Sequence, residues 1–166
     1  MNHYKSWSGL NKQLSNFLCE ALKDKITYFL TRYHDVHNAY GRAAVLIDKT
    51  ELVDFSWIEG YEQEFAISRL HDNGIPWEER KEKLKTEWDK NCTYNEMDFL
   101  SAATAFLQMP ISDALNSDNY IIRIFAILDK RVGKSTLQAI KSESSYKTLP
   151  EWVKQFYELR FSVSNC

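Results

Sequence analysis

Five side chains that can handle charge or protons are concentrated in one short stretch. Arg32, His34, Asp35, His37 and Arg42 lie within eleven positions of one another. Guanidinium groups bind carboxylates and phosphates through paired hydrogen bonds, and imidazoles change their charge near neutral pH. A histidine beside an aspartate can also act as a general base. The stretch therefore predicts either the recognition of an anion or acid–base chemistry.

Three interpretations of this stretch stay open. The simplest is a polar surface loop in which Asp35 pairs with an arginine, because structural ion pairs are commoner than tuned catalytic groups. The second is a binding site for an acidic protein surface or a phosphate, with Arg32, His34, His37 and Arg42 as the contacts. The third is a small hydrolase or nuclease with His34 or His37 as base, Asp35 as its orienting group and the arginines as oxyanion stabilisers.

We favour the second interpretation, a non-enzymatic binding or regulatory module, and keep the hydrolase or nuclease as the alternative. The partner would be a protein or the phosphate backbone of a nucleic acid, and the latter predicts an affinity that falls steeply with salt. Neither the partner's identity nor the oligomeric state follows from the sequence. We assign no catalytic residue.

No cofactor or metal is expected. The His34-x-x-His37 spacing lacks a further ligand at a suitable distance along the chain, whereas zinc sites usually have three or four ligands. The run from Gly133 to Thr136 resembles the end of a phosphate-binding loop. That motif requires a glycine five positions before Gly133, and Leu128 stands there.

The composition is that of an ordinary globular domain. The chain has 166 residues, of which 44% are hydrophobic, 14% aromatic and 27% charged. A formal charge of −2 argues against a protein that binds nucleic acid over its whole surface, but it allows a local basic patch. Three cysteines without a short pairing spacing favour a reducing compartment. With no resemblance to a signal peptide and no apolar run long enough to cross a membrane, we expect a cytoplasmic protein without a membrane partner.

The period of the apolar residues changes between Lys25 and Trp57. They alternate there, which predicts three antiparallel strands, whereas helical spacing holds on both sides. For the second hairpin we expect a three-residue loop, 49–51, which pairs Ile47 with Val53 and Val45 with Phe55. This register places Arg42, Asp54 and Ser56 together on the opposite face of the sheet.

The remaining segments are predicted to be helical. The first helix covers 10–22, and a second, over 58–70, has an apolar stripe expected to face the core, formed by Ile58, Tyr61, Phe65, Ala66 and Leu70. The segment 77–90 is almost entirely charged and predicts a solvated helix. Thr93 with Glu96 predicts a capping box for the next helix. Further helices are expected over 120–128, around 137–140 and from 151 onwards.

These elements predict a single α+β domain over residues 1–166. Its N-terminal helix would be followed by a three-stranded antiparallel sheet, with a helical C-terminal half packed on one sheet face.

Several of these segments also resemble an uncharacterised family of small bacterial hypothetical proteins. The similarity is carried by the runs Trp7–Leu14, Phe29–His34, Tyr40–Ala44, Asn116–Arg123 and Leu128–Lys134. It covers nearly the whole chain. The resemblance implies a bacterial cytosolic protein, and it transfers no activity.

Overall fold

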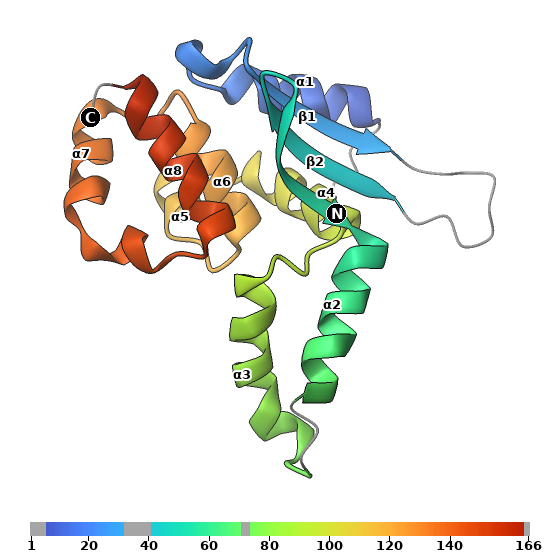
Figure 1. The fold of residues 1–166 in the computed structure, drawn as a ribbon. Helices are drawn as coiled ribbons and strands as arrows, with labels where there is room; N and C mark the ends of the chain where they lie inside the picture. The colour runs from blue at the N-terminus through green and yellow to red at the C-terminus, as the bar shows by residue number, and fades with distance from the viewer. Residues whose placement is uncertain (1–5, 32–40, 71–73, 165–166) are drawn as a thin grey trace.

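The computed structural model describes residues 6–31, 41–70 and 74–164. The elements are α1 (Trp7–Phe17), η1 (Glu20–Leu22), β1 (Ile26–Thr31), β2 (Arg42–Ile47), β3 (Thr50–Ser56), α2 (Trp57–Leu70), α3 (Trp77–Lys90), α4 (Glu96–Phe106), α5 (Ile111–Leu115), α6 (Tyr120–Leu128), α7 (Lys134–Ser142), η2 (Ser144–Thr148) and α8 (Glu151–Val163). The three strands pair antiparallel in the order β1-β2-β3 (Figure 1). The predicted α+β fold is therefore confirmed.

The sheet has one buried and one exposed face. In β1 the side chains of Ile26 and Tyr28 are buried, whereas those of Thr27 and Phe29, which alternate with them, are exposed. Helix α1 contacts β1 on the buried side, and α4 contacts β2 and β3. The alternation read from the sequence thus separates the two faces correctly.

Aromatic rings fill the space between the sheet and the helices. The fully buried ring of Phe99, on α4, lies 5.4 Å from that of Phe55, 5.5 Å from that of Phe125 and 6.0 Å from that of Trp7, measured between centroids. Phe99 therefore joins the first helix, the sheet and α6 in one core.

The turn between β2 and β3 differs from the three-residue loop that we expected. Ile47 pairs with Thr50, so only Asp48 and Lys49 form the turn, and both have positive φ, as a type I′ hairpin requires. A bulge between Val45 and Leu46 then shifts the register. Because the bulge restores the alternation, Val53 is still buried although the predicted pairing with Ile47 is wrong.

An ion pair between a buried carboxylate and a half-exposed arginine holds the end of α6 against α1. Asp129 is fully buried, and its carboxylate accepts hydrogen bonds from the Arg131 side chain and from the Arg131 backbone N–H. The guanidinium of Arg131 lies 4.3 Å from the ring centroid of Phe17. Asp129 is thus neutralised by a partner that also closes over the first helix.

Helices α2 and α3 lie side by side and extend away from the rest of the molecule (Figure 1). We call this pair the arm and the remaining elements the body. The predicted core stripe of α2 faces outwards, since Ile58, Tyr61 and Phe65 are 50%, 61% and 52% exposed. The expectation that this stripe packs on the core is therefore wrong, whereas α3 is the charged, largely solvated helix that we expected.

Of the helices in the described ranges, none combines the length and the apolar character needed to cross a bilayer.

Candidate functional site

The strand pair β1–β2 determines where the charged stretch of the sequence leaves the sheet. Thr31 pairs with Arg42 at the end of the ladder, so the connection between them begins and ends at the same end of the β1–β2 pair. Arg32, His34, Asp35 and His37 lie outside the described residues. Of the candidate contacts, the structure places Arg42.

The side chain of Arg42 lies on the exposed face of the sheet and is held by two carboxylates. Its Nε donates a hydrogen bond to Asp54, and its Nη2 donates one to Glu51. The guanidinium also lies 5.8 Å from the ring centroid of Phe29, whose side chain is exposed. The hydrogen bond to Glu51, followed by that to Asp54, raises the pKa of Arg42, so this group stays charged. Two negative charges therefore face this single positive charge.

Glu96 fixes the position where the connection re-enters the sheet. Its side chain, in the first turn of α4, is only 6% exposed, and its Oε1 accepts a hydrogen bond from the backbone N–H of Gly41 at 3.2 Å. A Cβ atom at position 41 would lie 2.6 Å from Cγ of Glu96. Among the described residues Oε2 of Glu96 has no hydrogen-bond partner. Gly41 is thus required by the close approach of a buried carboxylate.

The predicted capping box is wrong, and this explains how Glu96 becomes available. The N-cap of α4 is Asn95, whose side chain accepts hydrogen bonds from the N–H groups of Met97 and Asp98, while Asp98 accepts one from the N–H of Asn95. Because the box begins two residues after Thr93, Glu96 is free to turn towards Gly41.

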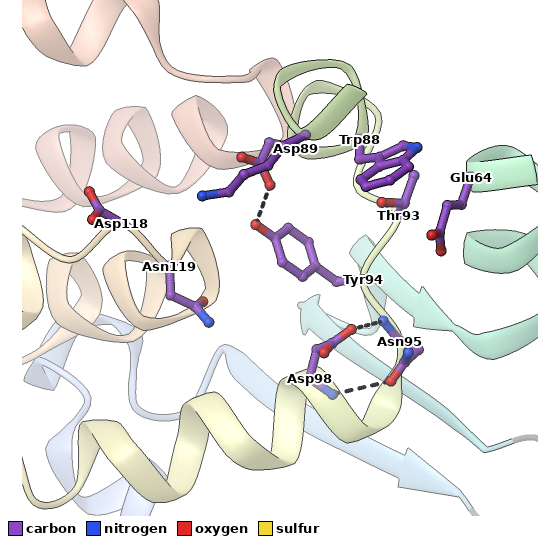
Figure 2. Close-up of a pocket in the computed structure, with 10 residues that line it drawn as sticks. Glu64, Trp88, Asp89, Thr93, Tyr94, Asn95, Asp98, Asp118 and Asn119 are labelled. Carbon is purple, nitrogen blue, oxygen red and sulfur yellow. Dashed lines mark hydrogen bonds between the residues drawn. The ribbon is translucent and has the colours of Figure 1, made fainter. Parts of the chain in front are cut away.

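A cleft of ≈ 560 Å³ lies where the arm meets the body (Figure 2). Its walls come from α2, the end of α3, the start of α4 and the segment before α6. The lining residues are Glu64, Lys85, Trp88, Asp89, Thr93, Tyr94, Asn95, Asp98, Asp118 and Asn119. Four carboxylates against one lysine make the cleft acidic, which disfavours an anionic ligand.

Some polar groups of the cleft are hydrogen-bonded within the protein. The Tyr94 hydroxyl donates a hydrogen bond to Asp89 at 2.6 Å (Figure 2). Burial, and then the bond to Asp89, raises the pKa of Tyr94, so the phenol is a donor and not a base at neutral pH. The indole N–H of Trp152, from α8, donates to the backbone oxygen of Asp89 at 2.7 Å. These bonds connect α3 to α8 and to the segment between α3 and α4, so the cleft lies at the joint between arm and body.

The described part of the chain contains no group of three or more His, Cys, Asp or Glu side chains that could hold a metal ion.

The sequence indicated some of these contacts and missed others. The predicted face shared by Arg42 and Asp54 is confirmed, since their side chains are hydrogen-bonded. Glu51 was placed in the turn, and the bulge brings it within reach of Arg42 instead. Nothing in the sequence pattern connects Glu96 with Gly41, because the two residues are 55 positions apart and meet only after α4 packs on the sheet.

A protein-family model matches residues 6–161, which is nearly the full length. The chain belongs to the SF0329 protein family. The match includes every helix and strand of the body and the whole arm, up to the last turn of α8. No curated protein and no solved structure matches the chain. Membership of the SF0329 family supports the resemblance seen in the sequence, while the bacterial origin stays a prediction.

Proposed function

We propose that this member of the SF0329 family is a non-enzymatic binding or regulatory module of the bacterial cytoplasm. It contacts an acidic or phosphate-bearing partner through Arg32, His34, His37 and Arg42. One observation supports this proposal more than the others. Arg42 is held on the exposed face of the sheet, beside the exposed ring of Phe29, at the base of the hairpin that carries the other three side chains.

The contacts of Arg42 imply that the four candidate residues have different roles in binding. Because Asp54 and Glu51 already neutralise Arg42, this guanidinium attracts an external anion only weakly. Arg42 therefore serves chiefly to fix the base of the hairpin, next to the anchor that Glu96 provides for Gly41. Arg32 and the two histidines therefore provide most of the electrostatic attraction for the partner.

The histidines make the proposed affinity dependent on pH. An unperturbed imidazole becomes charged below about pH 6.5, which adds positive charge to the hairpin. Binding to an anionic partner should therefore strengthen as the pH falls from 8 to 6. In a His34→Ala, His37→Ala double variant this pH dependence should disappear.

The test uses two defined probes and matched arginine and lysine variants. A fluorescent single-stranded oligonucleotide represents a phosphate backbone, and a fluorescent poly-glutamate peptide represents an acidic protein surface. We expect one of the probes to bind at low salt and Arg32→Ala to weaken that binding by roughly tenfold, the loss of one charge-assisted contact. Arg42→Ala should weaken it less.

Lys49→Ala is the control, because Lys49 is an exposed cation in the turn at the opposite end of the same sheet. Equal weakening by Lys49→Ala and Arg32→Ala would mean that only the overall charge matters. The absence of binding to either probe at low salt, together with no companion in a low-salt purification from a bacterial host, would contradict the proposal.

A further inference from the structure

Helix α2 presents its apolar side to solvent, which is the reverse of the usual arrangement. Ile58, Tyr61 and Phe65 follow one another at spacings of three and four residues, so they lie on one side of the helix. The rings of Tyr61 and Phe65 are stacked, with centroids 6.3 Å apart and an angle of 12° between their planes. The guanidinium of Arg69 lies 5.6 Å from the centroid of Phe65 and continues the same row.

The body determines which side of α2 faces inwards. Gly60 is buried, and a Cβ atom at this position would lie 2.7 Å from the backbone oxygen of Thr93. The helix backbone therefore rests against the segment that follows α3. Because Gly60 lies on the side of the helix away from Phe65, the aromatic row is held away from the body.

The charges beside the row are arranged to complement a second copy of themselves. Glu62 and Arg69 are seven residues apart, so they lie two turns from each other on the same side of α2, about 10 Å along its axis. When two such helices pack antiparallel, Glu62 of each copy faces Arg69 of the other. When they pack parallel, Glu62 faces Glu62 and Arg69 faces Arg69, which is repulsive.

We propose that two copies of the chain associate through their arms, with α2 packed antiparallel against α2 of the second copy about a two-fold axis near Phe65. An interface of this kind uses the same patch on both subunits. The arm extends clear of the body (Figure 1), so the two bodies lie at opposite ends of the pair. This proposal is independent of the hairpin site, of which Arg42 lies on the sheet.

The exposed apolar side chains of α2 supply the centre of such an interface. Ile58, Tyr61 and Phe65 present an area on the order of 300 Å². The rest of the roughly 800 Å² that each partner contributes to a standard interface comes from the polar side chains beside the row. In the antiparallel arrangement the tip of each arm lies near Ile58 of the other copy. The largely charged α3 then forms the solvent side of a four-helix unit.

The first test is the mass of the full-length chain in a reducing buffer, measured by light scattering and sedimentation over a wide concentration range. We expect the mass to rise to twice the chain's 19.5 kDa. Phe65→Glu should weaken this association by roughly a hundredfold, because it places a charge at the centre of the interface. Phe29→Glu, which changes an exposed ring on the sheet, is the matched control and should leave the association unchanged.

The second test addresses the register. Glu62→Arg and Arg69→Glu should each weaken self-association by about tenfold, since each converts two attractive pairs into two repulsive ones. An equimolar mixture of the two variants should associate again, because both pairs are then attractive. Circular dichroism should show both variants folded, as the two side chains are exposed.

Three results would overturn the proposal. The wild-type chain could remain monomeric at all concentrations, in which case another partner or none covers the row. The dimer could be insensitive to Phe65→Glu, which would place the interface elsewhere. The mixture of charge variants could stay monomeric, which would exclude the antiparallel register.

Discussion

The body and the arm use the same sequence pattern in opposite ways. In α1, Leu10 and Leu14 are four residues apart and are buried. In α2, Tyr61 and Phe65 have the same spacing, yet both are exposed. Helical periodicity identifies the side chains that share a face. What covers that face depends on contacts with segments far away in the sequence. Helical periodicity carries no information about such contacts.

The two regions also differ in how their charges are used. In the body, the fully buried carboxylate of Asp129 is paired with Arg131, whereas buried Glu96 is held by a hydrogen bond from the backbone of Gly41. In the arm, Glu62 and Arg69 border an apolar row at the surface. The body thus holds its buried charges with its own residues, whereas the charges of the arm lie at the surface beside exposed apolar side chains, as the proposed self-association requires.

The strongest test of this difference is to remove one phenylalanine from each region. Phe99→Ala should lower the free energy of unfolding by about 3–5 kcal/mol, because it leaves a cavity among the rings of Phe55, Phe125 and Trp7. Phe65→Ala should change it by less than about 0.5 kcal/mol. Urea denaturation measures both, at one low protein concentration so that association does not contribute.

Equal losses from the two substitutions would contradict the distinction between the regions. A large loss from Phe65→Ala alone would show that α2 packs its aromatic row inside the chain. A small loss from Phe99→Ala would mean that the body tolerates a cavity at its centre.

Much of the fold could be predicted from the sequence because it depends on local patterns. Alternation located the three strands, and helical spacing located most helices of the C-terminal half. It missed the short α5, and it extended the first helix to residue 22, whereas α1 ends at Phe17. The predicted β2–β3 register is wrong because the turn is one residue shorter than expected and a bulge at Val45 and Leu46 compensates for it. Together the two irregularities leave the pattern of apolar residues unchanged, so the sequence does not reveal them. The burial of α2 failed because its rotation depends on contacts with other segments, such as that of Gly60 with the backbone of Thr93.

The candidate site could be predicted only where it follows the strand period. Arg42 and Asp54 share a face of the sheet, and alternation was sufficient to place them together. The Glu96 anchor depends on how α4 packs against the sheet, and no local pattern carries that information. For the same reason the sequence could not indicate the acidic cleft, whose walls come from four separate segments.

A matched pair of arginines gives the next largest expected effect. Arg131 and Arg69 both lie over an aromatic ring, but Arg131 also neutralises a fully buried carboxylate. Arg131→Ala should cost about 3 kcal/mol, because Asp129 is left buried without its partner. Arg69→Ala should cost less than about 0.5 kcal/mol.

Asp129→Asn provides the control for this pair. It removes the buried charge and leaves a half-exposed Arg131 that can turn to water, so its cost should be smaller than that of Arg131→Ala. If Asp129→Asn were the more destabilising of the two, the buried carboxylate would be stabilised by groups other than Arg131. Thermal and urea denaturation both give the order.

A pair of glycines tests the contacts at the base of the hairpin and at the root of the arm. Gly41→Ala should cost about 1–2 kcal/mol, because its Cβ would overlap the side chain of Glu96. In a Glu96→Ala background the cost should largely vanish, since the obstacle is gone. Gly60→Ala should also destabilise the protein, but its obstacle is the backbone of Thr93, so Thr93→Ala should give no rescue.

The double-mutant cycle separates this contact from a general sensitivity at position 41. Strongly non-additive effects of Gly41→Ala and Glu96→Ala are expected, because the two positions are in contact. Additive effects would show that Gly41 is required for another reason and that Glu96 does not anchor the hairpin.

The smallest predicted effect concerns Cys92, which lies at the joint between the two regions. Burial raises the pKa of its thiol to about 12, from 9.0 for a free group, and the negative charge of Asp54 adds to the rise. Because the folded state holds this proton more tightly than the unfolded state, the contribution to stability is complete below pH 9. It is then lost progressively as the pH rises from 9 towards 12.

Comparing the wild type with Cys92→Ala isolates this contribution. Between pH 8 and pH 10 the wild type should lose about 1 kcal/mol more stability than the variant, measured by urea denaturation in the presence of a reductant. Above pH 10 both should decline, because the pKa values of Tyr28, Tyr94 and Tyr157 are also raised by burial. Parallel profiles from pH 8 to 10 would mean that water reaches the thiol at the joint. The boundary between arm and body would then be open, and the arm would be attached to the body less firmly than its contacts with Trp152 and Thr93 indicate.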